Sequence, residues 1–516
     1  MKLRKTLCVM VALIILATCT LSGCGDKKTA NVSNENDNKV TYWVQLVSAV
    51  SQTLSSLNET PYAKELEKRT GIDVEYIHPP LGQEQEKFNL LIASNNMPDI
   101  IFWNWNSHYT GGPGKAIREK RIIPLNNYEK SAPNFFNYIK SDKEIEKMSK
   151  TDSGDYYGFT SIKSDKTLTV TDGLILRKDW LDDLGLSVPE TIEEWDVVLK
   201  AFKDKKGATA PISTRSWGLP PFASAYDIKD TYYQENGKVK YGPLEPNYKD
   251  YLAKLNQWYN EGLIDKDIAT IDDMTVNSNI LTGVSGVTYN SIGGGIGRYM
   301  NAATEPGYDL IGAPYPVSKK GELPEYAGCV AMVPGSAAAI TTNCDNVETA
   351  LKLLDFGYSE EGRMFMNFGV EGETYEMIDG YPTYTELITN NSEGLSLAET
   401  LGRYTQASVS APTVQDARYM DQYAALPSQK KTRENWTNHD SLKTLYPPVN
   451  PKDEDLNEYT RLKTDINTYK SEMFMKFVLG VESIENYDNF VAGLKTRGID
   501  RLLELMQEAL DAYNAR

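Results

Sequence analysis

The sequence contains few of the residues that build many catalytic and metal sites: its 516 residues include five cysteines and three histidines. The histidines, His78, His108 and His439, are far apart in the chain, and neither an HExxH nor a CxxC motif occurs. A GxSxG nucleophile elbow is also absent. These absences argue against a zinc enzyme, and they leave a Ser–His–Asp hydrolase with few histidines to use as a base.

The glycine-rich segments do not match nucleotide-binding motifs. Residues 111–116, GGPGKA, lack the spacing of a P-loop and have no hydroxyl residue after the lysine. Residues 293–297, GGGIG, lack the third glycine of a dinucleotide-binding fingerprint. The formal net charge of −17 makes nucleic acid and anionic lipid headgroups unfavourable partners.

The N-terminus has the pattern of an export signal. Basic residues precede an apolar stretch at residues 7–21, which is short for a membrane span. The segment LSGC at Leu21–Cys24 resembles a bacterial lipobox. The resemblance implies that residues 1–23 are a lipoprotein signal peptide, that they are removed, and that Cys24 carries the lipid. An uncleaved anchor helix and an ordinary secretory signal are the alternatives.

The segment after the anchor contains no apolar cluster, so residues 24–39 are expected to form a flexible tether. Only Cys329 and Cys344 lie beyond the leader and the anchor. An extracellular location is compatible with a disulfide between them, but their spacing along the chain does not establish one.

Strand and helix signals alternate in the first folded stretch. Thr60 is a predicted N-cap, Pro61 occupies the first helical position and Gly71 ends the helix. The whole stretch shows strands at residues 40–46, 72–78 and 98–103, with helices at 60–69 and 83–94. This β-α-β-α-β order predicts a parallel sheet.

Later segments predict a second α/β lobe. A capping-box pattern from Thr191 to Glu194 predicts the start of a helix. Extended segments are predicted at residues 172–177, 286–289, 309–314 and 337–342, and further helices at 251–261, 346–356, 459–477 and 499–513.

Several of these segments, in their order, resemble a known family. They include LLIASNNMPDIIFW, ILRKDWLDDLGLSVPETIEEWDVVLKAFKD, GYDLIGAPYP, TALKLLDFGYSEEGRMFMNFGVEGETYE and INTYKSEMFMKFVLG. Together they are similar to extracellular solute-binding proteins of family 1, the carbohydrate-type lipoproteins of ABC importers. The resemblance implies an α/β, periplasmic-binding-protein-like (type II) fold, with two lobes, a hinge and a ligand cleft between the lobes. Lobe one is expected at residues 40–165 plus 311–365, and lobe two at residues 166–310 plus 366–516.

The same resemblance implies a function without catalysis. A monomer anchored to the outer face of the cell membrane closes around a sugar or oligosaccharide and presents it to ABC permease subunits. No cofactor is expected. Some relatives hold calcium in the loop that here reads KDKKGATAP at residues 203–211, and one aspartate among three lysines supplies too few oxygen ligands, so no metal is expected. A receptor for a peptide or another non-sugar solute, and a lipid-anchored glycoside hydrolase, are the alternatives.

Ligands of open parallel α/β sheets bind beyond the carboxyl ends of the strands. Trp103 and Trp105 would point the same way in an extended segment and form a stacking platform for a sugar. Packing of both indoles at the sheet edge is the alternative. The full set of candidate ligand-binding residues is Trp43, Gln45, Asp99, Trp103, Asn104, Trp105, Trp217, Tyr289, Asn290, Arg298, Glu371 and Tyr375.

Overall fold

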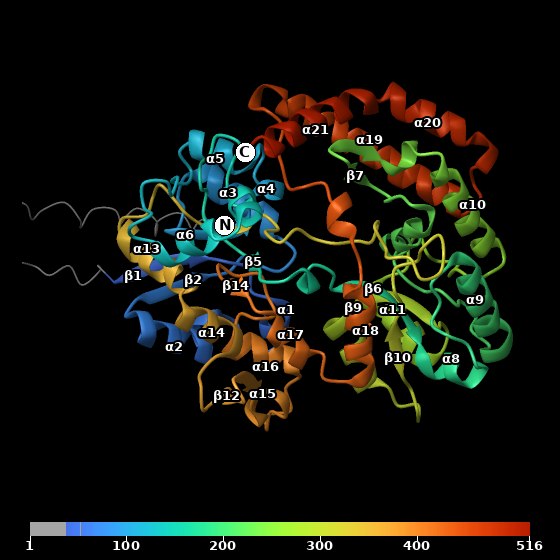
Figure 1. The fold of residues 1–516 in the computed structure, drawn as a ribbon, viewed down its shortest axis with the longest axis horizontal. Coiled ribbons are helices and arrows are strands. Elements are labelled where there is room, and N and C mark those ends of the chain that lie inside the picture. The colour runs from blue at the N-terminus through green and yellow to red at the C-terminus, as the bar shows by residue number, and fades with distance from the viewer. Residues whose placement is uncertain (1–37, 52) are drawn as a thin grey trace, which may run out of the picture. The chain divides into compact units, whose positions relative to one another are not determined.

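The computed structural model describes residues 38–51 and 53–516 (Figure 1). The predicted signal peptide, Cys24 and almost all of the predicted tether lie outside the described residues. Residues 38–516 form one compact unit that contains two separate main sheets, each with its own helices. None of the helices in the described part of the chain is long and apolar enough to span a bilayer.

The sheet of lobe one has five strands in the order β2-β1-β3-β11-β4. The pairs β1–β2 and β1–β3 are parallel, as the β-α-β-α-β signal predicts, whereas β11 is antiparallel to β3 and β4. The strands are β1 (Lys39–Trp43), β2 (Asp73–Ile77), β3 (Ile100–Asn104), β4 (Phe159–Thr160) and β11 (Ser336–Ile340). The helices of the first half of this lobe are α1 (Ser48–Ser51), α2 (Pro61–Thr70), α3 (Glu84–Ser94), α4 (Trp105–His108), α5 (Gly112–Arg118), α6 (Pro133–Lys140) and α7 (Lys143–Met148).

The sheet of lobe two has three strands in the order β10-β6-β9, all antiparallel to their neighbours. Its strands are β6 (Asp172–Arg177), β9 (Val287–Ser291) and β10 (Leu310–Gly312), with a hairpin of β7 (Tyr232–Glu235) and β8 (Lys238–Tyr241). The helices are α8 (Lys178–Leu184), α9 (Ile192–Lys206), α10 (Asn247–Asn260), α11 (Asp273–Thr282), α12 (Arg298–Ala302), α18 (Pro427–Thr437), α19 (Leu456–Val478), α20 (Tyr487–Thr496) and α21 (Ile499–Asn514).

Local capping signals explain where helices start and stop. The Thr60 hydroxyl accepts a hydrogen bond from the backbone of Ala63, and Gly71 ends α2 in the left-handed region at φ 70°, as predicted. At α9 the Thr191 hydroxyl accepts from the backbone of Glu194, but the Glu194 carboxylate accepts from the backbone of Glu190. The predicted capping box is therefore only half formed.

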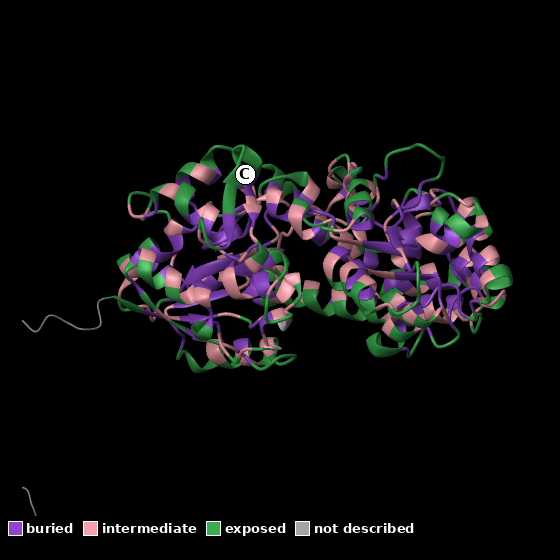
Figure 2. Cartoon of the chain, turned by 90° about the horizontal axis from the view of Figure 1, so that it is seen from below, coloured by how far each residue is buried: buried purple, intermediate pink, exposed green. Residues whose placement is uncertain are grey.

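Each lobe has its own hydrophobic core. In Figure 2 the buried residues gather along the strands and on the inner faces of the helices. A cluster around Tyr42, Ile100 and Phe135 fills lobe one, and a cluster around Trp195, Trp258 and Phe477 fills lobe two. Cys344 packs against the first cluster and Cys329 against a separate cluster in lobe two, and both thiols are free.

The segment after residue 365 is shared between the lobes. It contains α14 (Glu360–Phe368), β12 (Tyr375–Ile378), β13 (Tyr381–Tyr384), α15 (Glu386–Thr389), α16 (Leu397–Tyr404) and α17 (Ala417–Tyr423), after α13 (Val347–Phe356). Helix α16 packs against α1 and α2 of lobe one, whereas α18 packs against β10 of lobe two. We propose that the boundary predicted at residue 365 lies instead near residue 426; the other predicted boundaries stay predictions.

Candidate functional site

Three segments of the chain cross between the lobes, and they are hydrogen-bonded to one another. The first crossing runs from β4 to β6 through β5 (Ile162–Lys163), the second from β10 to β11, and the third from β14 (Val414–Gln415) to α18. The backbone N–H of Ile162 donates to Thr413, that of Ser164 to Gln415, and that of Lys163 to Met332 of the second crossing, at 2.9–3.1 Å. This bundle of short strands is the structural equivalent of a hinge.

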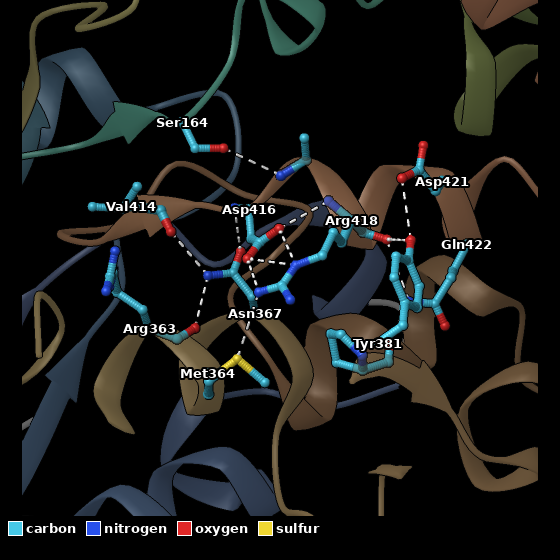
Figure 3. A network of polar contacts seen from close by, with 12 residues as sticks. Ser164, Arg363, Met364, Asn367, Tyr381, Val414, Asp416, Arg418, Asp421 and Gln422 are labelled. Atoms are coloured by element: carbon cyan, nitrogen blue, oxygen red, sulfur yellow. Dashed lines mark hydrogen bonds and ion pairs between the residues drawn. The ribbon is translucent and has the colours of Figure 1, made fainter. Parts of the chain in front are cut away.

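A buried amide fixes the third crossing to lobe one. Asn367 at the end of α14 is fully buried. Its amide N–H groups donate to the carbonyl oxygens of Val414 at 2.9 Å and Arg363 at 2.8 Å, and its carbonyl accepts from the backbone of Asp416 at 2.8 Å (Figure 3). The hydroxyl of Ser164 accepts from the backbone of residue 417 at 3.3 Å and links the first crossing to the third. These hydrogen bonds tie the start of the third crossing to α14 and to the first crossing.

Two ionisable groups flank the first crossing. The ammonium of Lys163 donates to the side-chain carbonyl of Gln415 at 3.2 Å, and burial lowers its pKa to about 8. Asp172 begins β6, and burial raises the pKa of its carboxyl. The negative charge of Asp172 raises the pKa of Lys163, but by less than burial lowers it. The hinge thus contains a half-buried cation whose hydrogen-bond partner is neutral.

Lobe two presents an aromatic pair, one ring exposed and one half-buried, where the sequence predicts ligand contacts. Trp217 lies in the short 3-10 helix η3 (Ser216–Gly218), and its side chain is 54% exposed. Tyr289 on β9 meets it edge to face, with ring centroids 5.3 Å apart. The Tyr289 ring is half-buried, and burial raises the pKa of its phenol to about 12, so it is a neutral hydrogen-bonding group at physiological pH. This pair offers the apolar face and hydroxyl that suit a sugar ring.

The predicted tryptophan platform of lobe one is contradicted by burial. Trp105 is 0% and Trp43 2% exposed, and both lie in a cluster around Phe88. The indole N–H of Trp105 donates to the backbone carbonyl of Ala337 at 3.2 Å. The segment after β3 is the helix α4 rather than an extended chain, so the i, i+2 argument does not apply.

Trp103 differs from its two neighbours. Its side chain is half-buried, contacts His108 at 4.8 Å between ring centroids, and has a buried indole N–H without a hydrogen-bond partner among the described residues. An unpaired buried donor is costly and is commonly satisfied by water or a ligand. Trp103 therefore stays a candidate for ligand binding in lobe one.

The polar candidates near the ends of β1 and β3 make contacts within the protein. Asp99 accepts from the backbone and hydroxyl of Thr41, both at 2.7 Å, and so ties the start of β3 to β1. Asn104 caps α4 by accepting from the backbone of Ser107 at 3.1 Å. Gln45 is exposed and donates to Glu84 at 2.9 Å. The first two have structural roles within lobe one, and ligand contacts of all three residues stay predictions.

The remaining candidates have different surroundings. Asn290 donates to the Tyr299 hydroxyl at 3.0 Å, and Arg298 donates to the side-chain carbonyl of Asn277 at 3.0 Å. Tyr375 is buried beside Phe368 in lobe one, which contradicts a direct ligand contact of its ring. The side chain of Glu371 in the same turn is exposed, and its ligand contact stays a prediction.

The glycine run of residues 293–297 lies in a π-helix, η6 (Ile292–Gly297). A Cβ built at Gly293 would lie 2.0 Å from the hydroxyl of Tyr423 on α17. Tyr423 therefore packs directly against the backbone of this glycine run. Glycine is required here for lobe-to-lobe packing beside the hinge.

A cavity of about 470 Å³ lies between the lobes, and the sequence gives little sign of it. Asn106 of α4 and Asn450 of lobe two meet across it, with 3.4 Å between amide nitrogen and oxygen. Its main lining residues are Asn106, Gly111, Arg118, Lys150, Asp152, Ser153, Asn450, Lys452, Asp453, Glu508 and Arg516. They come from residues 106–153 and 449–516, so only the folded structure brings them together.

The loop after α9 provides a poor donor set for a cation. Lys203 donates to the backbone carbonyl of Glu261, and Lys206 forms an ion pair with Asp183 at 2.6 Å. Asp204 is the one carboxylate within residues 203–211. Within residues 38–51 and 53–516, no group of three or more His, Cys, Asp or Glu side chains is arranged to hold a metal ion. The residues present do not fit calcium at this loop.

Comparisons with known proteins identify the family and several relatives of this chain. Residues 55–364 match the family model described as bacterial extracellular solute-binding protein. The chain is 28% identical over 410 residues to lipoprotein LipO of Bacillus subtilis, covering 76% of this chain and 78% of LipO. It is 24% identical to the fructooligosaccharide ABC transporter substrate-binding protein FusA of Streptococcus pneumoniae, covering 99% of both chains.

A solved structure agrees with these matches. The alginate-binding protein AlgQ2, solved without calcium ion, superposes with a TM-score of 0.74 at 25% identity, covering 92% of this chain and 98% of AlgQ2. The predicted two-lobed α/β fold is confirmed by this likeness and by the two sheets described above. With the family model matching more than half of its residues, the chain belongs to the bacterial extracellular solute-binding protein family.

Proposed function

We propose that this protein captures an oligosaccharide outside the cytoplasm and delivers it to an ABC importer, with Cys24 as its lipid anchor to the membrane. The observation that carries the ligand-binding step is the cavity of about 470 Å³ lined by both lobes, in a chain whose lobes are joined by a hinge of three crossings. FusA and AlgQ2 are sugar-binding proteins by name, and LipO is a lipoprotein by name, which supports the same interpretation.

In this proposal each lobe supplies part of the ligand contacts. On lobe two, Trp217 and Tyr289 supply a ring face and a hydroxyl, and Trp217 is 54% exposed. On lobe one, Trp103 supplies an indole N–H that lacks a partner among the described residues. Asn106 and Asn450 supply amide groups from opposite sides of the cavity. Amides and hydroxyls pair with sugar hydroxyls, and aromatic faces pack on their C–H groups.

Closure follows from this division. A ligand that contacts only one lobe binds the open and closed states equally and shifts nothing. A ligand that bridges Trp217 and the cavity amides gains contacts only when the lobes approach, so it favours the closed state. A permease that recognises the closed state then receives loaded protein in preference to empty protein. No step in this sequence forms or breaks a covalent bond.

The test is a binding experiment with product analysis. The mature protein is titrated by calorimetry with kestose, raffinose, maltotetraose and oligosaccharides of alginate and galacturonate, and each sugar is then recovered and sized by chromatography. We expect at least one oligosaccharide to bind and to be recovered intact. Shortened sugars in the recovered sample, or no heat with every sugar while a peptide mixture raises the Tm, would overturn the proposal.

A variant localises the site on lobe two. Trp217→Ala is expected to lower affinity for the bound sugar at least tenfold, about 1.4 kcal/mol, because an exposed indole that a ligand covers on binding contributes strongly to the binding energy. Val197 on α9 is 55% exposed on the same lobe, so Val197→Ala is the matched control and should leave the affinity unchanged. Equal affinities of the two variants would remove Trp217 from the site.

A further inference from the structure

The cavity between the lobes contains many charged groups, and how these groups are paired limits which ligand can enter. Its lining includes the cations Arg118, Lys150, Lys452 and Arg516 and the carboxylates Asp152, Asp453 and Glu508. Such a set can bind an anionic sugar only if at least one cation is free to receive the carboxylate.

Two of these pairs join the lobes. Arg118 of α5 forms a two-armed ion pair with Asp453, and its Nε lies 2.9 Å from Oδ2. Arg516 donates from Nε and Nη2 to Asp152 at 2.9 and 2.7 Å. Arg118 therefore already holds both oxygens of a carboxylate in the forked geometry that a uronate would need, and Arg516 holds Asp152 through the single oxygen Oδ1.

The other cations are also occupied. Lys452 pairs with Glu508 at 2.7 Å, and Lys150 pairs with Glu146 at 2.6 Å. The remaining Nη1 of Arg516 donates to the backbone carbonyls of residues 147 and 150 at 3.1 and 2.6 Å. Each cation of the lining thus has a carboxylate partner. The four cations are balanced by the three carboxylates of the lining together with Glu146, which lies outside it.

The uncharged polar groups of the cavity can still form hydrogen bonds with the hydroxyls of a sugar. The contact between the Asn106 and Asn450 amides is long, at 3.4 Å, so each amide keeps hydrogen-bonding capacity. The hydroxyl of Ser153 also lines the cavity. The chain as a whole carries a formal net charge of −17, which further opposes the approach of a polyanion at low salt.

We infer that the interlobe cavity takes an uncharged, hydroxyl-rich oligosaccharide and discriminates against uronate-containing oligosaccharides. This inference rests on the proposed function, since it names the class of sugar bound at the site proposed there. A uronate must either displace Asp152 or Asp453 from its arginine or enter without a cationic partner. Either route costs affinity, because a carboxylate taken from water without a partner loses its hydration uncompensated.

The test compares matched ligands and charge-altering variants. The wild-type protein is titrated with kestose, raffinose and maltotetraose, and separately with galacturonate and alginate oligosaccharides of similar length, at low salt and at about 0.15 M salt. The variants Asp453→Asn and Asp152→Asn keep the shape of the side chain and free one arginine each. Glu472→Gln, which removes the partner of Lys476 on the solvent face of α19, is the control with the same change in total charge.

We expect the wild type to bind a neutral oligosaccharide at least tenfold more tightly than any uronate. Asp453→Asn and Asp152→Asn should each gain at least tenfold in uronate affinity, whereas Glu472→Gln should gain nothing. Tighter uronate binding by the wild type, or the same uronate affinity in all three variants with unchanged Tm values, would overturn the inference while leaving an oligosaccharide-binding function in place. Failure of every sugar to bind would instead overturn the proposed function itself.

Discussion

Gly112 is the position where one added methyl group tests the contact between the lobes. It is the first residue of α5, with φ at 70°, and a Cβ built there would lie 2.3 Å from Nδ2 and 2.7 Å from Cγ of Asn450. Gly154 offers the matched control, because its φ is 83° and a Cβ there would meet nothing within 4 Å. Gly112→Ala thus combines backbone strain with an overlap between lobes, and Gly154→Ala has the backbone strain alone.

The magnitudes follow from these two effects. A non-glycine residue in the left-handed region costs about 1–2 kcal/mol, and this cost applies to both variants. Forcing an atom into an occupied contact adds about 1–3 kcal/mol, and this cost applies to Gly112→Ala alone. We therefore expect the free energy of unfolding to fall by about 1–2 kcal/mol in Gly154→Ala and by about 2–5 kcal/mol in Gly112→Ala.

The assay is urea unfolding with linear extrapolation, repeated in the background Asn450→Ala. In that background the overlapping amide is gone, so Gly112→Ala should cost no more than Gly154→Ala. Since Asn450 also lines the cavity, Gly112→Ala should weaken oligosaccharide binding as well, whereas Gly154→Ala should not. Equal costs of the two glycine variants in the wild-type background would refute the reasoning.

Three further predictions concern other parts of the chain. Burial lowers the pKa of Lys163 from 10.5 to about 8, so between these two pH values the unfolded chain binds more protons than the folded chain. Over that range the free energy of unfolding should rise with pH by on the order of 3 kcal/mol more in the wild type than in Lys163→Met. Parallel pH profiles of the two proteins would contradict this. Millimolar calcium followed by a chelator should leave the Tm unchanged, because Asp204 is the one carboxylate of its loop; a calcium-dependent rise in Tm that is lost in Asp204→Ala would overturn this expectation. Cys24→Ser should move the protein from the membrane fraction to the soluble fraction and abolish labelling by radioactive palmitate, and persistent labelling would show that the lipid lies elsewhere.

Local signals predicted much of the fold. The caps Thr60 and Gly71 fix the ends of α2, and the alternation of strands and helices predicts the parallel order of β1, β2 and β3. Both are short-range effects, in which hydrogen bonds and backbone conformation depend on residues a few positions apart. The sequence therefore contains enough information for the elements themselves and for the fold class.

The candidate site was predicted less well, because its surroundings are long-range. Asn104 is a favoured N-cap residue, and its side chain accepts from the backbone of Ser107 at the start of a helix. In this helix the side chain of Trp105 is buried in the core instead of facing a ligand. The exposure of Trp217 could be predicted, because a tryptophan in a loop rich in proline and glycine has few neighbours to cover it. The cavity could not, since Asn106 and Asn450 lie 344 residues apart in the chain and meet only after both lobes have folded.

Closure of the two lobes around an intact sugar is the central claim, and small-angle X-ray scattering with and without the ligand tests it most directly. The account predicts that saturating oligosaccharide lowers the radius of gyration of the mature protein and that the sugar is recovered unchanged. It also predicts that Trp217→Ala requires more sugar to reach the same compact state. A radius of gyration that stays constant while the sugar is bound, or a sugar that leaves the protein shortened, would contradict it.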